Sequence, residues 1–170
     1  MATRQIPEVL KDFSVTIQGV GYAGVMDEIT LPDLDIETMD YRAAGMDGVI
    51  RMDMGQKPME ATFKTKKDSP DLLGQWGLAD ANTRAICRKS MGGQGTQEKP
   101  VVVTMVGAFN TFKPGNLKPK DGGGLEHKMD VTYLKYAIDG GDTIEIDILN
   151  GKRIINGVDV LAQRRANLAI

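Results

Sequence analysis

Apolar and polar residues alternate along much of the chain, and this two-residue period predicts a protein built mainly of β-strands. The clearest case is the stretch 144–148, in which three isoleucines alternate with Glu145 and Asp147. Such a pattern is typical of a half-buried strand with a polar outer face. Glycine-rich turns separate the β-like stretches. On these two signals, strands are expected at 13–18, 24–36, 59–64, 84–90, 101–112, 128–138 and 143–149.

Two short helices are expected beside the strands, which makes the predicted fold mainly β with a minor α part. In the segment 69–77, Ser69 occupies the capping position and Pro70 the first helical position. The side chains expected to pack this helix against a sheet are those of Leu72, Leu73 and Trp76.

A second helix is expected over 158–168 at the end of the chain, with Asn156 as its cap. Arg164 and Arg165 near its end suit the negative pole of the helix dipole. The apolar stripe that predicts a packed amphipathic helix consists of Val158, Leu161 and Leu168.

The segment 39–58 is long for a simple connection, and ordered long loops are usually functional or bound by a partner. Met46, Met52, Met54 and Met59 cluster in and beside it. Methionine adapts to irregular apolar surfaces, so these residues suit an interface, although they could equally fill the protein's own core. The segment is therefore expected to be an extended interaction loop within a single domain that spans residues 1–170.

Composition excludes several classes of protein. A net charge of −2 gives no overall attraction to nucleic acid or to an acidic membrane. No apolar run approaches the length that spans a bilayer, and the N-terminus lacks a secretory pattern, so the chain is expected to stay in the cytoplasm. A lone cysteine, Cys87, precludes an intrachain disulfide and is expected to be buried in a strand.

Charge is distributed unevenly along the chain. Residues 1–60, 61–120 and 121–170 carry net charges of −6, +6 and −2. One interpretation is a set of solvated loops of differing sign. The other is that unlike patches meet between copies of the chain, because head-to-tail contacts need two complementary surfaces.

Candidate chemistry is sparse, and no enzyme, metal site or cofactor is predicted. Residues 19–24 match G-x-G-x-x-G after a strand, but the dinucleotide motif needs a helix to follow, whereas 25–31 alternates as a strand. A tight hairpin turn is expected there instead. His127 has no neighbours at metal-ligand spacing. Asp33 and Asp35 share a strand face, but paired acids need burial in a cleft for acid–base work.

Several short motifs, in order from about residue 13 to 168, resemble those of the major tail tube proteins of contractile-tailed phages and of related contractile bacteriocins. They occupy 19–24, 29–32, 41–48, 52–55, 126–128 and 155–159. The resemblance implies a β-sandwich or small barrel with a flanking helix, and six copies in a ring whose stacking forms a tube with a continuous barrel as its inner wall. Such assembly would bury the strand edges that an isolated subunit exposes.

The resemblance also implies which residues and partners serve assembly. The partners would be further copies of the chain, the tail sheath, a tape-measure protein, a baseplate hub and a tail terminator, with DNA passing through the lumen without specific binding. Candidates for the lumen are Asp130, Glu145 and Asp147. The residues expected at subunit contacts are Tyr41, Arg42, Ala43, Ala44, Gly45, Met46, Asp47, Gly48, Met52, Asp53, Met54 and Gly55.

Alternative functions stay open at this point. The same architecture could form the tube of a bacteriocin or of a type VI-like injection particle, which carries no genome. A monomeric β-sandwich that binds a small ligand, or a hydrolase that uses scattered residues, is the alternative from another class.

Overall fold

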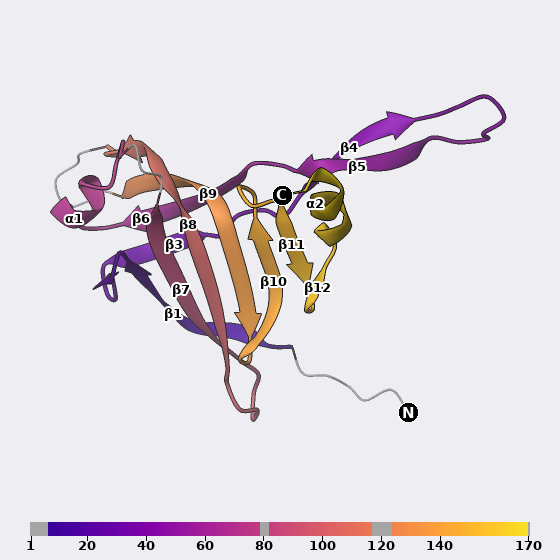
Figure 1. The fold of residues 1–170 in the computed structure, drawn as a ribbon. Coiled ribbons are helices and arrows are strands. Elements are labelled where there is room, and N and C mark those ends of the chain that lie inside the picture. The colour runs from indigo at the N-terminus through magenta and orange to yellow at the C-terminus, as the bar shows by residue number, and fades with distance from the viewer. Residues whose placement is uncertain (1–6, 79–81, 117–123, 170) are drawn as a thin grey trace.

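The computed structural model describes residues 7–78, 82–116 and 124–169. One large sheet and a projecting two-stranded hairpin dominate the described chain, with a small helix at each end of the sheet (Figure 1). No helix in these ranges is long and apolar enough to span a bilayer. The elements are β1 (Val9–Ile17), β2 (Val20–Gly21), β3 (Met26–Thr30), β4 (Ile36–Tyr41), β5 (Ile50–Gln56), β6 (Met59–Thr65), α1 (Pro70–Leu73), β7 (Thr83–Gly92), β8 (Lys99–Lys113), β9 (Leu125–Ile138), β10 (Gly141–Asp147), β11 (Lys152–Ile155), β12 (Val158–Asp159) and α2 (Ala162–Leu168).

The large sheet is antiparallel and follows the order β12-β11-β10-β9-β8-β7-β1-β2. Strand β9 is its branch point, because its first half pairs with β6 and its second half with β10, while β8 pairs along the other edge. Strand β3 pairs with the far edge of β6. The series β1-β7-β8-β9-β6-β3 therefore curves around one core, like a barrel that has not closed.

The core consists of the side chains on the concave face of this curved sheet. Val15 and Cys87 pair across β1 and β7, and Met105 and Leu134 pair across β8 and β9, all buried. Phe63 and Phe109 pack at 5.4 Å between ring centroids. This burial follows from the alternation in the sequence, because every second residue of a strand points to the same face. The burial of Cys87 confirms the sequence-based expectation.

Six of the seven expected strands are confirmed, with ends shifted by up to four residues. The expected strand at 24–36 is wrong in its extent: only Met26–Thr30 is a strand, the segment 31–35 around Pro32 has no strand pairing, and Ile36 begins β4.

The 19–24 segment is confirmed as a turn and short strand: Gln18 and Gly19 both have positive φ, 48° and 83°, as a tight two-residue hairpin turn requires. No helix begins there, so the geometry does not match a dinucleotide site.

The first helix is confirmed in its start at Pro70, but it ends at Leu73, before the expected end at 77, and its packing is confirmed only in part. Leu72 is buried, whereas Trp76 is exposed and its indole N–H donates to the carbonyl oxygen of Asn110 at 3.0 Å. Ser69 precedes the helix, but its hydroxyl makes no capping hydrogen bond.

The expected helix over 158–168 is wrong in its start, its cap and its packing. Asn156 and Gly157, with φ of 48° and 80°, form the tight turn between β11 and β12. Helix α2 begins only at Ala162, and none of its residues is buried. The three residues of the expected stripe do not lie on one helix face, because Val158 belongs to β12 and Leu161 precedes the helix.

Candidate assembly surface

The segment expected as a loop at 39–58 is an ordered β-hairpin, formed by β4 and β5 and joined by residues 42–49. It projects well beyond the large sheet (Figure 1). At its tip, Met46 and Ala43 close a turn in which the Met46 N–H donates to the Ala43 carbonyl oxygen at 3.2 Å. Gly45 in this turn has a φ of 85°, which favours glycine.

The hairpin has one apolar and one polar face. Met39 pairs with Met52, and Tyr41 pairs with Ile50, so these four side chains share a face. The pairs Thr38–Asp53 and Asp40–Arg51 occupy the other face. All four apolar side chains are 44–50% exposed, so nothing in the described chain covers them fully. An amphipathic strand pair of this kind normally packs its apolar face against another surface.

The methionines divide between the two interpretations left open by the sequence. Met59 is 2% exposed and belongs to the core, as its place in β6 requires. Met52 and Met54 are exposed on the hairpin, and Met46 is half-buried in the tip by the hairpin's own turn. The methionines of the hairpin, and not Met59, are therefore the ones available to a partner.

A buried arginine anchors the base of the hairpin to the sheet. The Arg153 guanidinium, on β11, is almost fully buried and lies 3.0 Å from the Asp53 carboxylate on β5. The Gly55 N–H also donates to this carboxylate, at 2.7 Å. The hydrogen bond from Gly55, and next that from Arg153, lower the pKa of the Asp53 carboxyl. The hairpin is thus fixed in its direction, although its outer part stands free of the sheet.

A second ion pair lies at the C-terminal end of the sheet. Arg165 of α2 pairs with Asp159 of β12 and also donates to the Gly151 carbonyl oxygen at 2.9 Å. The Leu161 N–H donates to the same aspartate at 3.0 Å. The hydrogen bond from Arg165 is the main cause of a lowered pKa for the Asp159 carboxyl. This pair ties the largely exposed α2 to the strand before it.

The lowered pKa values of Asp53 and Asp159 predict how the two ion-pair anchors respond to acid. Because their pKa values are lowered in the folded chain, the anchors are fully formed above the ordinary aspartate value of about 4 and weaken as the pH falls through the lowered values. In an NMR titration, the Gly55 and Leu161 amide resonances should therefore shift with midpoints at pH values below the ordinary aspartate pKa. Asp53→Asn should abolish the Gly55 transition and spare that of Leu161. Transitions at the ordinary value would contradict the anchor geometry.

The three acids considered for a lumen share the convex, outer face of the sheet. Glu145 and Asp147 lie on β10 opposite Lys135 and Tyr133 of β9, and Asp130 points outward from the first half of β9. Lysines interleave with acids on this face, as the pairs Lys128–Glu60 at 2.7 Å and Lys135–Asp142 at 2.7 Å show. The face is therefore polar and of mixed charge.

Some of the unlike charges in the first two thirds of the chain pair with each other inside one subunit. Three ion pairs join acids of residues 1–60 to lysines of residues 61–120: Lys64–Glu28 at 2.8 Å, Lys66–Asp27 at 2.9 Å and Lys99–Glu8 at 2.9 Å. These contacts leave fewer unmatched charges for contacts between copies than the sequence alone suggests.

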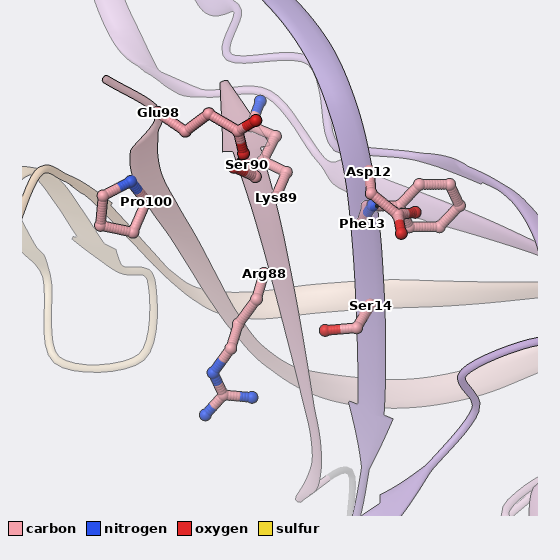
Figure 2. A pocket seen from close by; sticks show the side chains of 8 residues that line it. All are labelled: Asp12, Phe13, Ser14, Arg88, Lys89, Ser90, Glu98 and Pro100. Atoms are coloured by element: carbon pink, nitrogen blue, oxygen red, sulfur yellow. Dashed lines mark hydrogen bonds between the residues drawn. The ribbon is translucent and has the colours of Figure 1, made fainter. Parts of the chain in front are cut away.

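Other candidate chemistry has a structural explanation. His127 is buried between Phe109 and Phe112, and burial lowers the pKa of its imidazole. Within the described ranges, no group of three or more histidine, cysteine, aspartate or glutamate side chains is placed to hold a metal ion. An open groove between β1, β7 and β8 is lined mainly by charged and polar side chains (Figure 2).

Sequence reasoning missed Arg153 and Asp159 as functional candidates. Asp159 lies in one of the motifs that carried the family resemblance, and Asp53 lies in another. The structure shows that each of these aspartates receives an arginine, and that both arginines belong to the C-terminal part of the chain. An acid within each motif was the available signal, but the arginine partner of Asp53 is 100 residues away.

Comparison with known proteins gives consistent results in sequence and structure. Residues 7–168 match the family described as phage tail tube protein FII. The tail tube protein of Escherichia phage P2 is 31% identical over 97% of this chain and 99% of its own length. The major tail tube protein of Serratia phage KSP20 is 26% identical over 85% of both chains.

Solved structures with a similar fold come from contractile injection systems. A sheath/tube terminator of an extracellular contractile injection system aligns with a TM-score of 0.58, at 13% identity, over 81% of this chain and 99% of that one. A chain of the sheath-tube complex of such a system aligns with a TM-score of 0.58, at 12% identity, over 80% of this chain and 93% of that one.

Proposed function

This chain belongs to the phage tail tube protein FII family, and we propose that it polymerises as stacked hexameric rings into the inner tube of a contractile tail. The observation that carries the assembly mechanism is the projecting hairpin, whose apolar face of Met39, Tyr41, Ile50 and Met52 is exposed in the single subunit. Burial of such a face against a second copy is favourable, because each large apolar side chain removed from water contributes about 1.5–3 kcal/mol.

The subunit contact includes the whole hairpin and its tip. The residues expected from the sequence at subunit contacts all lie within it: Tyr41, Arg42, Ala43, Ala44, Gly45, Met46, Asp47, Gly48, Met52, Asp53, Met54 and Gly55. They serve different purposes in this proposal. Tyr41 and Met52 supply contact area, whereas Asp53 and Gly55 hold the hairpin in the direction from which it reaches a neighbour.

The outer face of the large sheet, with Asp130, Glu145 and Asp147, lines the lumen. Its lysines lie beside acids, as in the 3.9 Å pair Lys152–Glu145, so DNA would meet a wall without a continuous cationic track. A neutral to acidic bore lets DNA pass without binding. A reconstruction of the tube with a strongly basic bore would overturn this assignment.

The partners in this proposal are the tail sheath outside the tube, a tape-measure protein inside it, a baseplate hub at one end and a tail terminator at the other. The subunit would be made and assembled in the bacterial cytoplasm and end in the tail of the virion. The named relatives support a phage, because both come from phages.

A particle without a genome is the second candidate. This candidate is retained because the fold is similar to that of a tube terminating cap of the anti-feeding prophage, with a TM-score of 0.54 and 11% identity. The genes beside this one distinguish the two, since capsid genes indicate a phage and their absence indicates a bacteriocin-like or injection particle.

Negative-stain microscopy and light scattering of the purified protein test the tube itself. The proposal predicts rings or hollow tubes, and predicts that baseplate components lower the concentration at which they form. A monomer of 18.5 kDa that persists at all concentrations, with baseplate components present, would contradict it.

A further inference from the structure

The curved sheet stays open along one line, between β1 and β3. In the described chain, no strand pairing joins β1 to β3, and the edge of β1 from Val9 to Ser14 that faces away from β7 has no strand partner. Among residues 7–78, 82–116 and 124–169, strand β3 has one partner strand, β6. Two free strand edges thus border one gap, and free edges accept further strands readily.

This gap is an apolar groove, which we call the seam. Its apolar lining consists of Leu10 and Phe13 from β1, of Ile29 and Leu31 from the β3 side, and of Cys87 from β7. Leu10 is 51% exposed, and the neighbouring Val9 is similarly exposed at 52%. The seam therefore leaves apolar side chains in water at the place where the backbone also lacks partners.

The subunit's own hairpin does not cover its own seam. The chain leaves β3 and continues outward into β4, so the hairpin extends away from the sheet (Figure 1). Its base is fixed in this direction by the Lys57 N–H, which donates to the Asp35 carbonyl oxygen at 2.9 Å, and by the Asp53–Arg153 pair. A hairpin from another copy is free of this constraint.

Resting on the proposed function, we infer that the seam of one subunit receives the β4–β5 hairpin of a second copy. The apolar hairpin face of Met39, Tyr41, Ile50 and Met52 then covers Leu10, Phe13, Ile29 and Leu31. The hairpin's polar face points away from the groove. The contact joins two different surfaces of the same chain, so it repeats head to tail and generates a ring or a filament.

Charge around the seam favours this occupant. Residues 36–56 of the hairpin carry four acids and two arginines. On the β1–β7 side, Lys89 of β7 lines the seam and has no ion-pair partner among the described residues, whereas Asp27 and Glu28 on the β3 side are already paired with lysines. An acidic hairpin therefore approaches the more basic border.

Disulfide cross-linking between copies tests the seam directly. Leu10→Cys chains and Met52→Cys chains are mixed, assembled and oxidised, with assembly checked by microscopy. Because Cys87 also lines the seam, both variants carry Cys87→Ala as well, and we expect a reducible dimer in the mixture and none with either variant alone. Val158→Cys replaces Leu10→Cys as the control, since Val158 is another exposed apolar residue, on β12. Normal tubes without the Leu10–Met52 dimer, or with equal cross-linking to position 158, would overturn the inference.

A charge substitution gives a second test that does not depend on oxidation. Leu10→Asp should leave the circular dichroism spectrum unchanged, since Leu10 is half exposed, and raise the protein concentration needed for elongation by about tenfold or more. Leu149→Asp, at a 79% exposed position, should change the concentration needed for elongation by less than about twofold. Normal elongation by Leu10→Asp would overturn the seam as the receiving surface. It would leave the role of the hairpin intact, because that role is tested by changes in the hairpin itself.

Discussion

A variant with threonine at positions 39, 41, 50 and 52 is expected to fold as the parent chain does and to form no tubes. The four side chains replaced are already 44–50% exposed in the subunit, so their loss removes little packing from it. Threonine keeps the β-propensity of the hairpin. In the tube, each substitution removes apolar area that assembly would bury. The summed loss of association free energy from four such substitutions is large enough to prevent assembly. Sedimentation and negative-stain microscopy measure the loss of tubes.

The opposite face of the same hairpin provides the control. Asp40 and Arg51 form a solvent-exposed ion pair at 3.6 Å, at the register position between the two apolar pairs. Exposed pairs of this kind contribute little to stability. The double variant Asp40→Thr and Arg51→Thr should therefore still assemble. Tubes formed by the four-residue variant, or their loss in this control alone, would show that the apolar face is not the contact.

The second large effect is expected in the sheet itself, at Gly107 of β8. A Cβ atom at this position would lie 1.8 Å from the Asp130 carbonyl oxygen on β9, a distance at which the two strands must separate. The register shift between Val106 and Gly107 places the two backbones this close. Gly107→Ala should therefore lower the free energy of unfolding by at least about 3 kcal/mol, the range of severe core disruption.

Urea unfolding followed by circular dichroism checks this value. Gly48→Ala is a matched control, because Gly48 has no positive φ and no atom lies within 4 Å of its added Cβ. That substitution should change the stability by less than about 0.5 kcal/mol. Unfolding of the two variants at the same urea concentration would contradict the close backbone contact between β8 and β9 at Gly107.

The long strands could be predicted from the sequence because local pattern and tertiary environment agree there. In β8 and β9 every second residue faces the core for many residues, so the alternation is visible without knowledge of the partner strands. The hairpin was harder to predict. The apolar residues of β4, which are Ile36, Met39 and Tyr41, do not alternate regularly in the sequence. Ile50, Met52 and Met54 of β5 do alternate with polar residues, but a register shift leaves Met54 without a partner on β4.

The C-terminal helix was predicted too early because the turn signal of Asn156-Gly157 was interpreted as a cap. The same pair forms a two-residue hairpin turn when strands flank it, and Ile155 and Val158 pair across it. The Asp53–Arg153 anchor could not be predicted, because a single sequence gives no indication that two residues so far apart in the chain meet.

A cryo-EM reconstruction of the assembled tube tests the central claim most directly, because it shows what covers the hairpin. We predict a hollow tube of stacked rings in which Met39, Tyr41, Ile50 and Met52 of each subunit are buried against a neighbouring copy. A tube in which these four side chains face solvent, or an assembly without a continuous bore, would contradict the account.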